Sequence, residues 1–296
     1  MLFEDAQFEE RAREEMRRRE EDDRQRYLEQ DLQAHTAQLR MRLGDQQVRA
    51  GHVRRAIAEY KRAVKLDRSN AHLRTRLGDA YVLAEMVPQA MSQYREALRC
   101  DSDLPEPYGS LGDLYVRFGM MRQALEAYQT AVRLAPRRAF FRYKLGNTHL
   151  MLGMMEEAIA HLRTTVVLAP SDAFYRFRLA DVLLEAERPL EALDELCEAV
   201  RLAPYDDYYH ARCAAICLAL GRSADAIRIY QKARRIKPHN RCYDALLADA
   251  YDEAGMPDEA THHRRRAGEL DEYDQVFVRR RRDEARRARR AVASPT

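Results

Sequence analysis

The sequence Arg-Leu-Ala-Pro at residues 133–136 recurs, with small changes, every 34 residues. It returns as Val-Leu-Ala-Pro at 167–170, as Arg-Leu-Ala-Pro at 201–204 and as Arg-Ile-Lys-Pro at 235–238. A fixed period of this length is typical of proteins built from stacked structural repeats. A frame that begins at Ala37 divides the chain, without any insertion, into seven repeats: 37–70, 71–104, 105–138, 139–172, 173–206, 207–240 and 241–274.

Small residues occupy two fixed positions of this frame. Position 20 is alanine in all seven repeats, and position 8 is glycine in the first four and alanine in the last three. Larger apolar residues recur around them at helical spacing. The pattern predicts two antiparallel helices in each repeat, helix A over about positions 1–14 and helix B over about positions 16–30. The small residues allow the two backbones to approach closely.

The turn between the two predicted helices lies at position 15. Glycine occupies this position in five repeats, as Gly51, Gly119, Gly153, Gly221 and Gly255. A residue that ends a helix in this way commonly needs a positive φ, which glycine adopts readily. Two prolines, Pro189 and Pro257, then fall in the first turn of helix B, where a missing N–H costs no helical hydrogen bond. We therefore expect a positive φ at position 15.

The third repeat contains a motif that can be compared with a known family. It reads Tyr108-x2-Leu111-Gly112-x2-Tyr115…Ala124-x3-Tyr128…Pro136. This resembles the tetratricopeptide repeat (TPR) pattern W-x2-L-G-x2-Y…A-x3-F…P, and the shared register covers about 80% of the chain. The resemblance implies an all-α solenoid, a right-handed superhelix of antiparallel helix pairs with helix A on the concave side and helix B on the convex side.

Charged segments flank the repeats. Residues 1–36 contain 12 acidic and 7 basic residues, and acid–arginine pairs at i,i+4 spacing predict a charged helical extension. A coiled-coil partner site is the alternative, although no sustained heptad supports it. Residues 275–296 contain eight arginines against Asp283 and Glu284. They predict an arginine-rich helix or tail with a disordered end.

The C-terminal arginines suggest a second type of partner. They could contact a polyanion, meaning a nucleic acid or an anionic surface, through Arg279, Arg280, Arg281, Arg282, Arg286, Arg287, Arg289 and Arg290. The alternative is a solubilising helical extension of the last repeat. Phe277 is the only aromatic residue in this segment, whereas recognition modules usually combine several aromatic residues with basic ones.

Helix A carries the residues of a predicted binding groove. Positions 2, 5, 6 and 9 point away from the packing stripe and hold aromatic, basic and acidic residues. The predicted groove residues are Arg42, Asp45, Arg76, Asp79, Asp113, Phe140, Tyr143, Lys144, Asn147, Phe174, Phe177, Arg178, Asp181, Tyr208 and Arg212. In TPR proteins such side chains commonly hold an extended peptide. Two alternatives stay open, namely charge pairs that only neutralise each other and rings that neighbouring helices cover.

The remaining features of the sequence favour a protein without catalytic activity. The chain contains no glycine-rich phosphate loop, no Gly-x-Ser-x-Gly and no His-Glu-x-x-His. His210, Cys213 and Cys217 share one helix face, but they occupy core positions of the repeat. The five cysteines form no Cys-x-x-Cys, the N-terminus lacks a signal peptide, and the longest apolar runs are too short to cross a bilayer. We expect a cytoplasmic, non-enzymatic scaffold or adaptor for a protein or peptide partner, with no metal, no cofactor and no transmembrane segment.

Overall fold

The computed structural model describes the backbone of residues 2–293 and the side chains of residues 16–293. Within these residues the regular secondary structure consists of fifteen α-helices. They are α1 (Leu2–Arg49), α2 (Val53–Leu66), α3 (Ala71–Leu83), α4 (Val87–Cys100), α5 (Pro105–Arg117), α6 (Met121–Leu134), α7 (Ala139–Met151), α8 (Met155–Leu168), α9 (Ala173–Glu185), α10 (Pro189–Leu202), α11 (Asp207–Ala219), α12 (Ser223–Ile236), α13 (Cys242–Glu253), α14 (Pro257–Ala267) and α15 (Glu272–Ala293).

Each predicted repeat forms one pair of helices, so the all-α prediction is confirmed. Helices α3, α5, α7, α9, α11 and α13 are the A helices of repeats 2–7, and α4, α6, α8, α10, α12 and α14 are their B helices. The predicted extension over residues 1–36 and helix A of the first repeat form a single helix, α1, because no proline interrupts residues 1–49. Over the described part of the chain, no helix has both the length and the apolar character needed to span a bilayer.

The turn at position 15 has the predicted backbone conformation. All five glycines there have positive φ, between 70° at Gly119 and 76° at Gly51 and Gly153. Repeats 2 and 5 adopt the same conformation with Glu85 at φ 59° and Glu187 at φ 58°. A side chain in this region costs roughly 1–2 kcal/mol relative to the right-handed region. These two glutamates therefore destabilise their turns.

Glu187→Gly is expected to raise the free energy of unfolding by about 1 kcal/mol, because glycine adopts the left-handed conformation without a steric penalty. Denaturant unfolding of the full chain measures the effect. Glu185→Gly is the matched control, since Glu185 is the last helical residue of α9, two residues earlier. Glycine there should lower the free energy of unfolding, and an equal effect of both changes would contradict the turn explanation.

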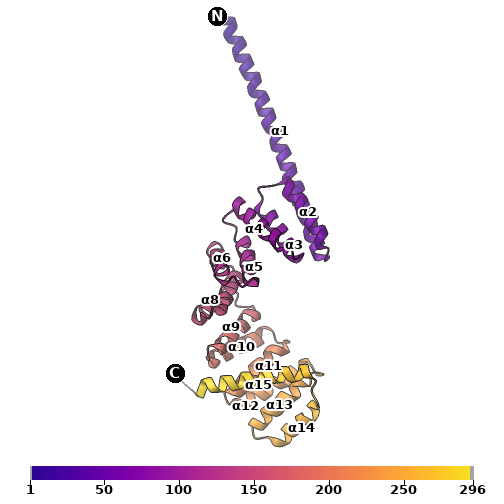
Figure 1. Cartoon of the computed structure of the whole chain (residues 1–296), viewed down its shortest axis with the longest axis vertical. Helices are drawn as coiled ribbons and strands as arrows, with labels where there is room; N and C mark the ends of the chain where they lie inside the picture. Colours follow the sequence, from indigo (N-terminus) through magenta and orange to yellow (C-terminus); the bar gives the residue numbers. More distant parts are fainter. Residues whose placement is uncertain (1, 294–296) are drawn as a thin grey trace. The chain divides into compact units, whose positions relative to one another are not determined.

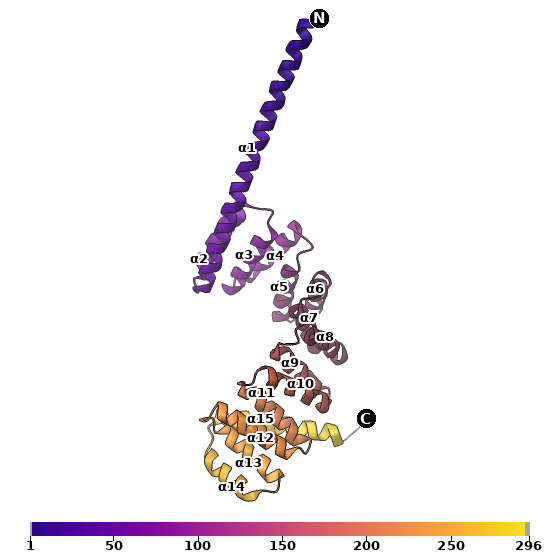
Figure 2. The ribbon, with the colours of Figure 1, turned by 180° about the vertical axis from the view of Figure 1, so that it is seen from behind.

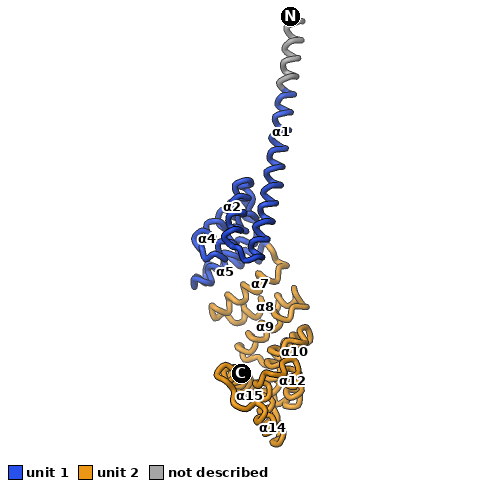
Figure 3. Tube along the Cα trace, turned by 90° about the vertical axis from the view of Figure 1, so that its right-hand side faces the viewer, with its two compact units in different colours: residues 1–134 blue, residues 135–296 orange. Residues whose placement is uncertain are grey.

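The chain divides into two compact units, residues 1–134 and 135–296 (Figure 3). In the first unit, a tyrosine of each helix B lies against the position-8 glycine of its own helix A. A Cβ atom at Gly78 would lie 2.5 Å from Cε1 of Tyr94, and Gly44 and Gly112 face Tyr60 and Tyr128 in the same way. In these three repeats the ring leaves no room for a Cβ atom at position 8, which explains the glycine.

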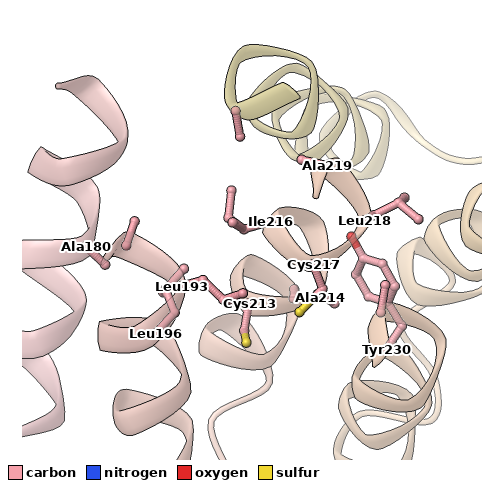
Figure 4. Packing of buried hydrophobic residues seen from close by; sticks show 14 of the residues in the cluster. Ala180, Leu193, Leu196, Cys213, Ala214, Ile216, Cys217, Leu218, Ala219 and Tyr230 are labelled. Carbon is pink, nitrogen blue, oxygen red and sulfur yellow. The ribbon is translucent and has the colours of Figure 1, made fainter. Parts of the chain in front are cut away.

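The second unit has the larger core. Ala180, Leu193, Leu196 and Ile216 are among its fully buried members, contributed by α9, α10 and α11 (Figure 4). His210, Cys213 and Cys217 are also buried, and Nδ1 of His210 lies 2.7 Å from the carbonyl oxygen of Asp206. These three side chains belong to the packing of the second unit.

Helix α15 does not continue the stack of repeats. After residues 268–271 the chain turns back, and α15 runs along α11 with further contacts to α13 and α10 (Figures 1 and 2). Its main neighbours α11 and α13 are both A helices. The arginine-rich segment predicted over residues 275–296 is thus helical from Glu272 to Ala293, and the end expected to be disordered reaches residues 294–296, outside the described residues.

Candidate functional site

The A helices of the second unit, α7, α9, α11 and α13, form a surface that we call the A face. Aromatic rings follow one another across it. The ring of Tyr143 on α7 lies 5.3 Å from that of Phe174 on α9, and the ring of Phe177 on α9 lies 5.6 Å from that of Tyr208 on α11. We call Phe140, Tyr143, Phe174, Phe177 and Tyr208 the aromatic ladder. The structure therefore brings these five predicted groove residues together.

The ladder is exposed at Phe140 and Phe174, which we call its open end, and is partly covered by α15 at Tyr208. Phe140 and Phe174 are both 44% exposed, whereas Phe177 is only 8% exposed. Nζ of Lys144 lies 5.2 Å from the centre of the Phe140 ring, a cation–π contact. Tyr208 is 38% exposed and lies beneath a guanidinium of α15. Solvent thus reaches Phe140, Phe174 and the uncovered part of Tyr208, while Phe177 is packed.

A row of alternating charges connects α9, α11 and α15. Arg178 and Asp181 on α9 form an ion pair of 2.9 Å, and Asp181 also lies 2.5 Å from Arg212 on α11. Nε of Arg212 lies 3.1 Å from Glu284 on α15, which in turn lies 3.0 Å from Arg281. Of the predicted groove residues, Arg212 therefore binds the C-terminal helix directly, and Asp181 binds Arg212.

Arg212 is the centre of this row. It is 7% exposed, and its guanidinium lies 5.1 Å from the centre of the Phe177 ring. Burial alone would lower its pKa, but Glu284 and Asp181 outweigh burial and raise the pKa of Arg212. Burial also raises the pKa of Glu284, against the opposite effect of Arg212 and Arg281. The charges at this junction are partly removed from water and depend on each other.

The junction is incompletely hydrogen-bonded. Among the described residues, no hydrogen-bond partner is found for Nε of Arg212, for Nε and Nη1 of Arg281, or for Oε2 of Glu284. Their 3.0–3.1 Å approaches are thus ion pairs without hydrogen-bond alignment. A hydrogen-bonded arrangement of the same charges would hold α15 more firmly.

Outer ion pairs attach α15 to α13. Arg282 donates two hydrogen bonds to Asp249, of 2.7 and 2.9 Å, and Arg289 pairs with Glu253 at 2.6 Å. Both arginines are about half exposed, and ion pairs in such surroundings contribute roughly 0–1 kcal/mol each. They orient the helix more than they stabilise it.

The predicted polyanion-contact residues fall into two groups. Arg281 is 4% exposed, and Arg282 and Arg289 are paired with carboxylates of α13, so three of the eight guanidinium groups are buried or held by α13. The other five, Arg279, Arg280, Arg286, Arg287 and Arg290, are exposed. Polyanion binding stays a prediction, and it concerns these five residues most directly.

The docking of α15 on the A face was missed by the sequence reasoning. A signal was present, because Val278, Arg281, Ala285 and Ala288 follow helical spacing. Val278, Arg281 and Ala288 are the buried residues of α15, and Ala285 packs against the same core. The stripe is narrow and contains an arginine itself, so it is hard to recognise among the eight arginines of this segment.

The predicted groove residues of the first unit have a structural role. Asp45 and Asp79 accept hydrogen bonds of 2.7 and 2.8 Å from Tyr60 and Tyr94 of their own helices B, and Asp113 accepts one from Tyr128. Burial raises the pKa of Asp79, although its hydrogen bonds from Tyr94 and Ser110 act in the opposite direction. Arg42 and Arg76 are exposed. In the second unit, Asn147 is half-buried.

Metal binding finds no support in this arrangement. Among residues 16–293, no group of three or more histidine, cysteine, aspartate or glutamate side chains is placed to hold a metal ion. The A face offers rings, guanidinium groups and carboxylates, which suit the recognition of another polypeptide.

Comparison with known proteins agrees with the repeat architecture. The tetratricopeptide repeat family matches residues 41–105, 105–138 and 132–272 of the chain. No curated protein matches the chain in sequence.

The chain is similar to several solved TPR structures. PilF of Pseudomonas aeruginosa is 18% identical, over 73% of this chain and 99% of its own, with a TM-score of 0.61. MamA is 25% identical, over 55% of this chain and 89% of its own, with a TM-score of 0.51. YrrB, described as a TPR protein with an unusual peptide-binding site, is 20% identical, over 65% of this chain and 97% of its own, with a TM-score of 0.52. The likenesses to PilF and YrrB concern the fold.

Proposed function

Because the chain belongs to the tetratricopeptide repeat family, we propose that it is a non-enzymatic scaffold that binds an extended peptide or a helix of a partner protein on its A face. Proteins of this family bind protein or peptide partners through such repeats. The observation that carries the proposal is the open end of the aromatic ladder, where Phe140 and Phe174 are exposed beside Lys144.

Exposed rings of this kind are suited to binding. Large apolar side chains that lie together on a surface commonly mark an interaction site, and aromatic residues supply much of the energy of protein interfaces. Tyr143 contacts both Phe174 and Tyr175, so the exposed rings rest on a packed layer. The surface is therefore already ordered, and a partner would bind it with little loss of conformational entropy in these side chains.

A photo-crosslinking amino acid placed at Phe140 or Phe174 is expected to capture the partner protein in the native host. Matched controls are Val167 on α8 and Leu190 on α10, which are exposed apolar residues of B helices. The expected result is a discrete crosslinked product at the two ladder positions that is absent at the two controls. The same products at all four positions, or none at the ladder, would reject the proposed site.

A further inference from the structure

We infer that the A face of α11 and α13 is a docking site for an arginine-bearing amphipathic α-helix, and that α15 is its tethered occupant, which a partner helix of the same chemistry replaces. The inference rests on the proposed function and deepens it, because it names the class of partner for the covered end of the A face. The protein would then have an open end, at Phe140 and Phe174, and a self-occupied end.

Helix α15 extends the aromatic ladder as a ligand would. The guanidinium of Arg281 lies 5.0 Å from the centre of the Tyr208 ring and 5.5 Å from that of Phe277. The ring of Phe277 meets Tyr243 of α13 edge-on at 6.1 Å. The rings that begin on α7 thus continue onto side chains of α15, which indicates that the A face recognises aromatic and guanidinium groups on a helix.

Charge complementarity defines the pattern that the face accepts. Asp249 and Glu253 of α13 face Arg282 and Arg289, and the buried row from Asp181 and Arg212 ends on Glu284. If Phe277 of α15 is position i, a partner helix of the same chemistry has an aromatic residue at i, arginines at i+4, i+5 and i+12, a glutamate at i+7 and small residues at i+8 and i+11. In this pattern the arginines at i+5 and i+12 meet the carboxylates of α13, the glutamate meets Arg212 of α11, and the small residues face the core.

Few residues of α15 are buried, as is expected of a helix that can undock. Only Val278, Arg281 and Ala288 of its 22 residues are buried, whereas α11 has eleven buried residues and α13 has nine. Most of its surface is therefore already in water. Nε of Arg212 on α11 and Oε2 of Glu284 on α15 lie 3.1 Å apart without a hydrogen bond, so α15 satisfies the face incompletely. A helix with better-aligned partners would bind there more favourably.

The short connection to α14 makes α15 a strong competitor. Helix α14 ends at Ala267 and α15 begins at Glu272, so the tether is four residues long. A short tether gives an effective concentration of the order of millimolar. A free helix of similar intrinsic affinity therefore competes poorly with α15 unless its own concentration is of the same order.

A labelled synthetic peptide with the sequence of residues 272–293 tests the inference on the full chain by fluorescence anisotropy. The chain variant Val278→Asp/Arg282→Glu places a charge at a buried position and reverses a paired one, so it should release α15 and leave α11 and α13 intact. The matched control Val276→Asp/Arg280→Glu makes the same changes at two exposed positions of the same helix.

The released variant is expected to bind the peptide at least about 100-fold more tightly than the wild-type chain or the matched control does. A peptide carrying Val278→Asp/Arg282→Glu should not bind. Adding Asp249→Lys/Glu253→Lys to the released variant should weaken binding by about tenfold or more, which ties the peptide to α13. Equal binding by all three chains, or no binding by a released variant whose α11 and α13 keep their wild-type protection from hydrogen exchange, would overturn the inference. Crosslinking at Phe140 and Phe174 would be unaffected by that failure, so the two proposals fail separately.

Discussion

Arg212→Ala is expected to release α15 from the second unit. Arg212 is the cation between Asp181 and Glu284, and its guanidinium also packs on the rings of Phe177 and Tyr208. Removing it leaves two carboxylates in a partly buried site with less positive charge. Breaking a buried ion pair in this way costs about 3 kcal/mol or more, which corresponds to roughly a 100-fold loss in the docking equilibrium.

Limited trypsin digestion with mass analysis measures the release, because α15 contains eight arginines that become accessible when the helix undocks. Arg212→Ala should be cut first within residues 279–290. Arg178→Ala is the control, since Arg178 pairs with the same Asp181 and, among the described residues, has no ion pair with α15. It should be cut no faster in this segment than the wild-type chain. Equal early cleavage of α15 in both variants would show that Arg212 does not hold the helix.

Tyr94→Ala is expected to lower the free energy of unfolding of the first unit by about 3–5 kcal/mol. The ring of Tyr94 is fully buried against Gly78, and its hydroxyl donates to Asp79. Truncation leaves a cavity that a glycine cannot fill. Since repeats interact mainly with their neighbours, hydrogen exchange should localise the loss to α3, α4 and the adjoining helices, with little change in the second unit.

Tyr94→Phe separates the ring from its hydroxyl. It should cost only about 1 kcal/mol, because the ring remains and one hydrogen bond is lost. The hydrogen bond from Tyr94 lowers the pKa of Asp79, so its removal should raise that pKa further, measurable by NMR titration. A group with a raised pKa stabilises the fold most below its unfolded-state pKa and loses that contribution as pH rises. The variant should therefore lose more stability at neutral than at acidic pH; a uniform loss would contradict the role of Asp79.

The repeat architecture was predictable because its causes are local and recur seven times. Small residues at positions 8 and 20 allow close helix pairs, and a turn at position 15 requires a positive φ that even Glu85 and Glu187 adopt. The pairing of Asp79 with Tyr94 was less visible, because the same aspartate also fits an exposed groove position. Positions 9 and 24 lie on different helices, and only the packed pair brings them together.

The fold-back of α15 could not be predicted from the period. The repeat frame relates each residue to its neighbours 34 positions away, whereas Arg212 meets Glu284 across more than two repeats. The final helix also lies outside the frame, so nothing periodic indicates whether it stacks on α14 or returns to the A face. Its few apolar residues are separated by arginines, and the ion pairs that seat it depend on the assembled α11 and α13.

Amide hydrogen exchange of the wild-type chain tests most directly whether α15 occupies the A face of the second unit. Most helical stability in proteins comes from packing against other elements rather than from intrinsic propensity, so strong protection of α15 indicates docking. We predict slowed exchange across residues 274–291, together with faster exchange in α15 when Val278→Asp/Arg282→Glu is introduced. Exchange of α15 amides at the rates of an unstructured peptide in the wild-type chain would contradict the account.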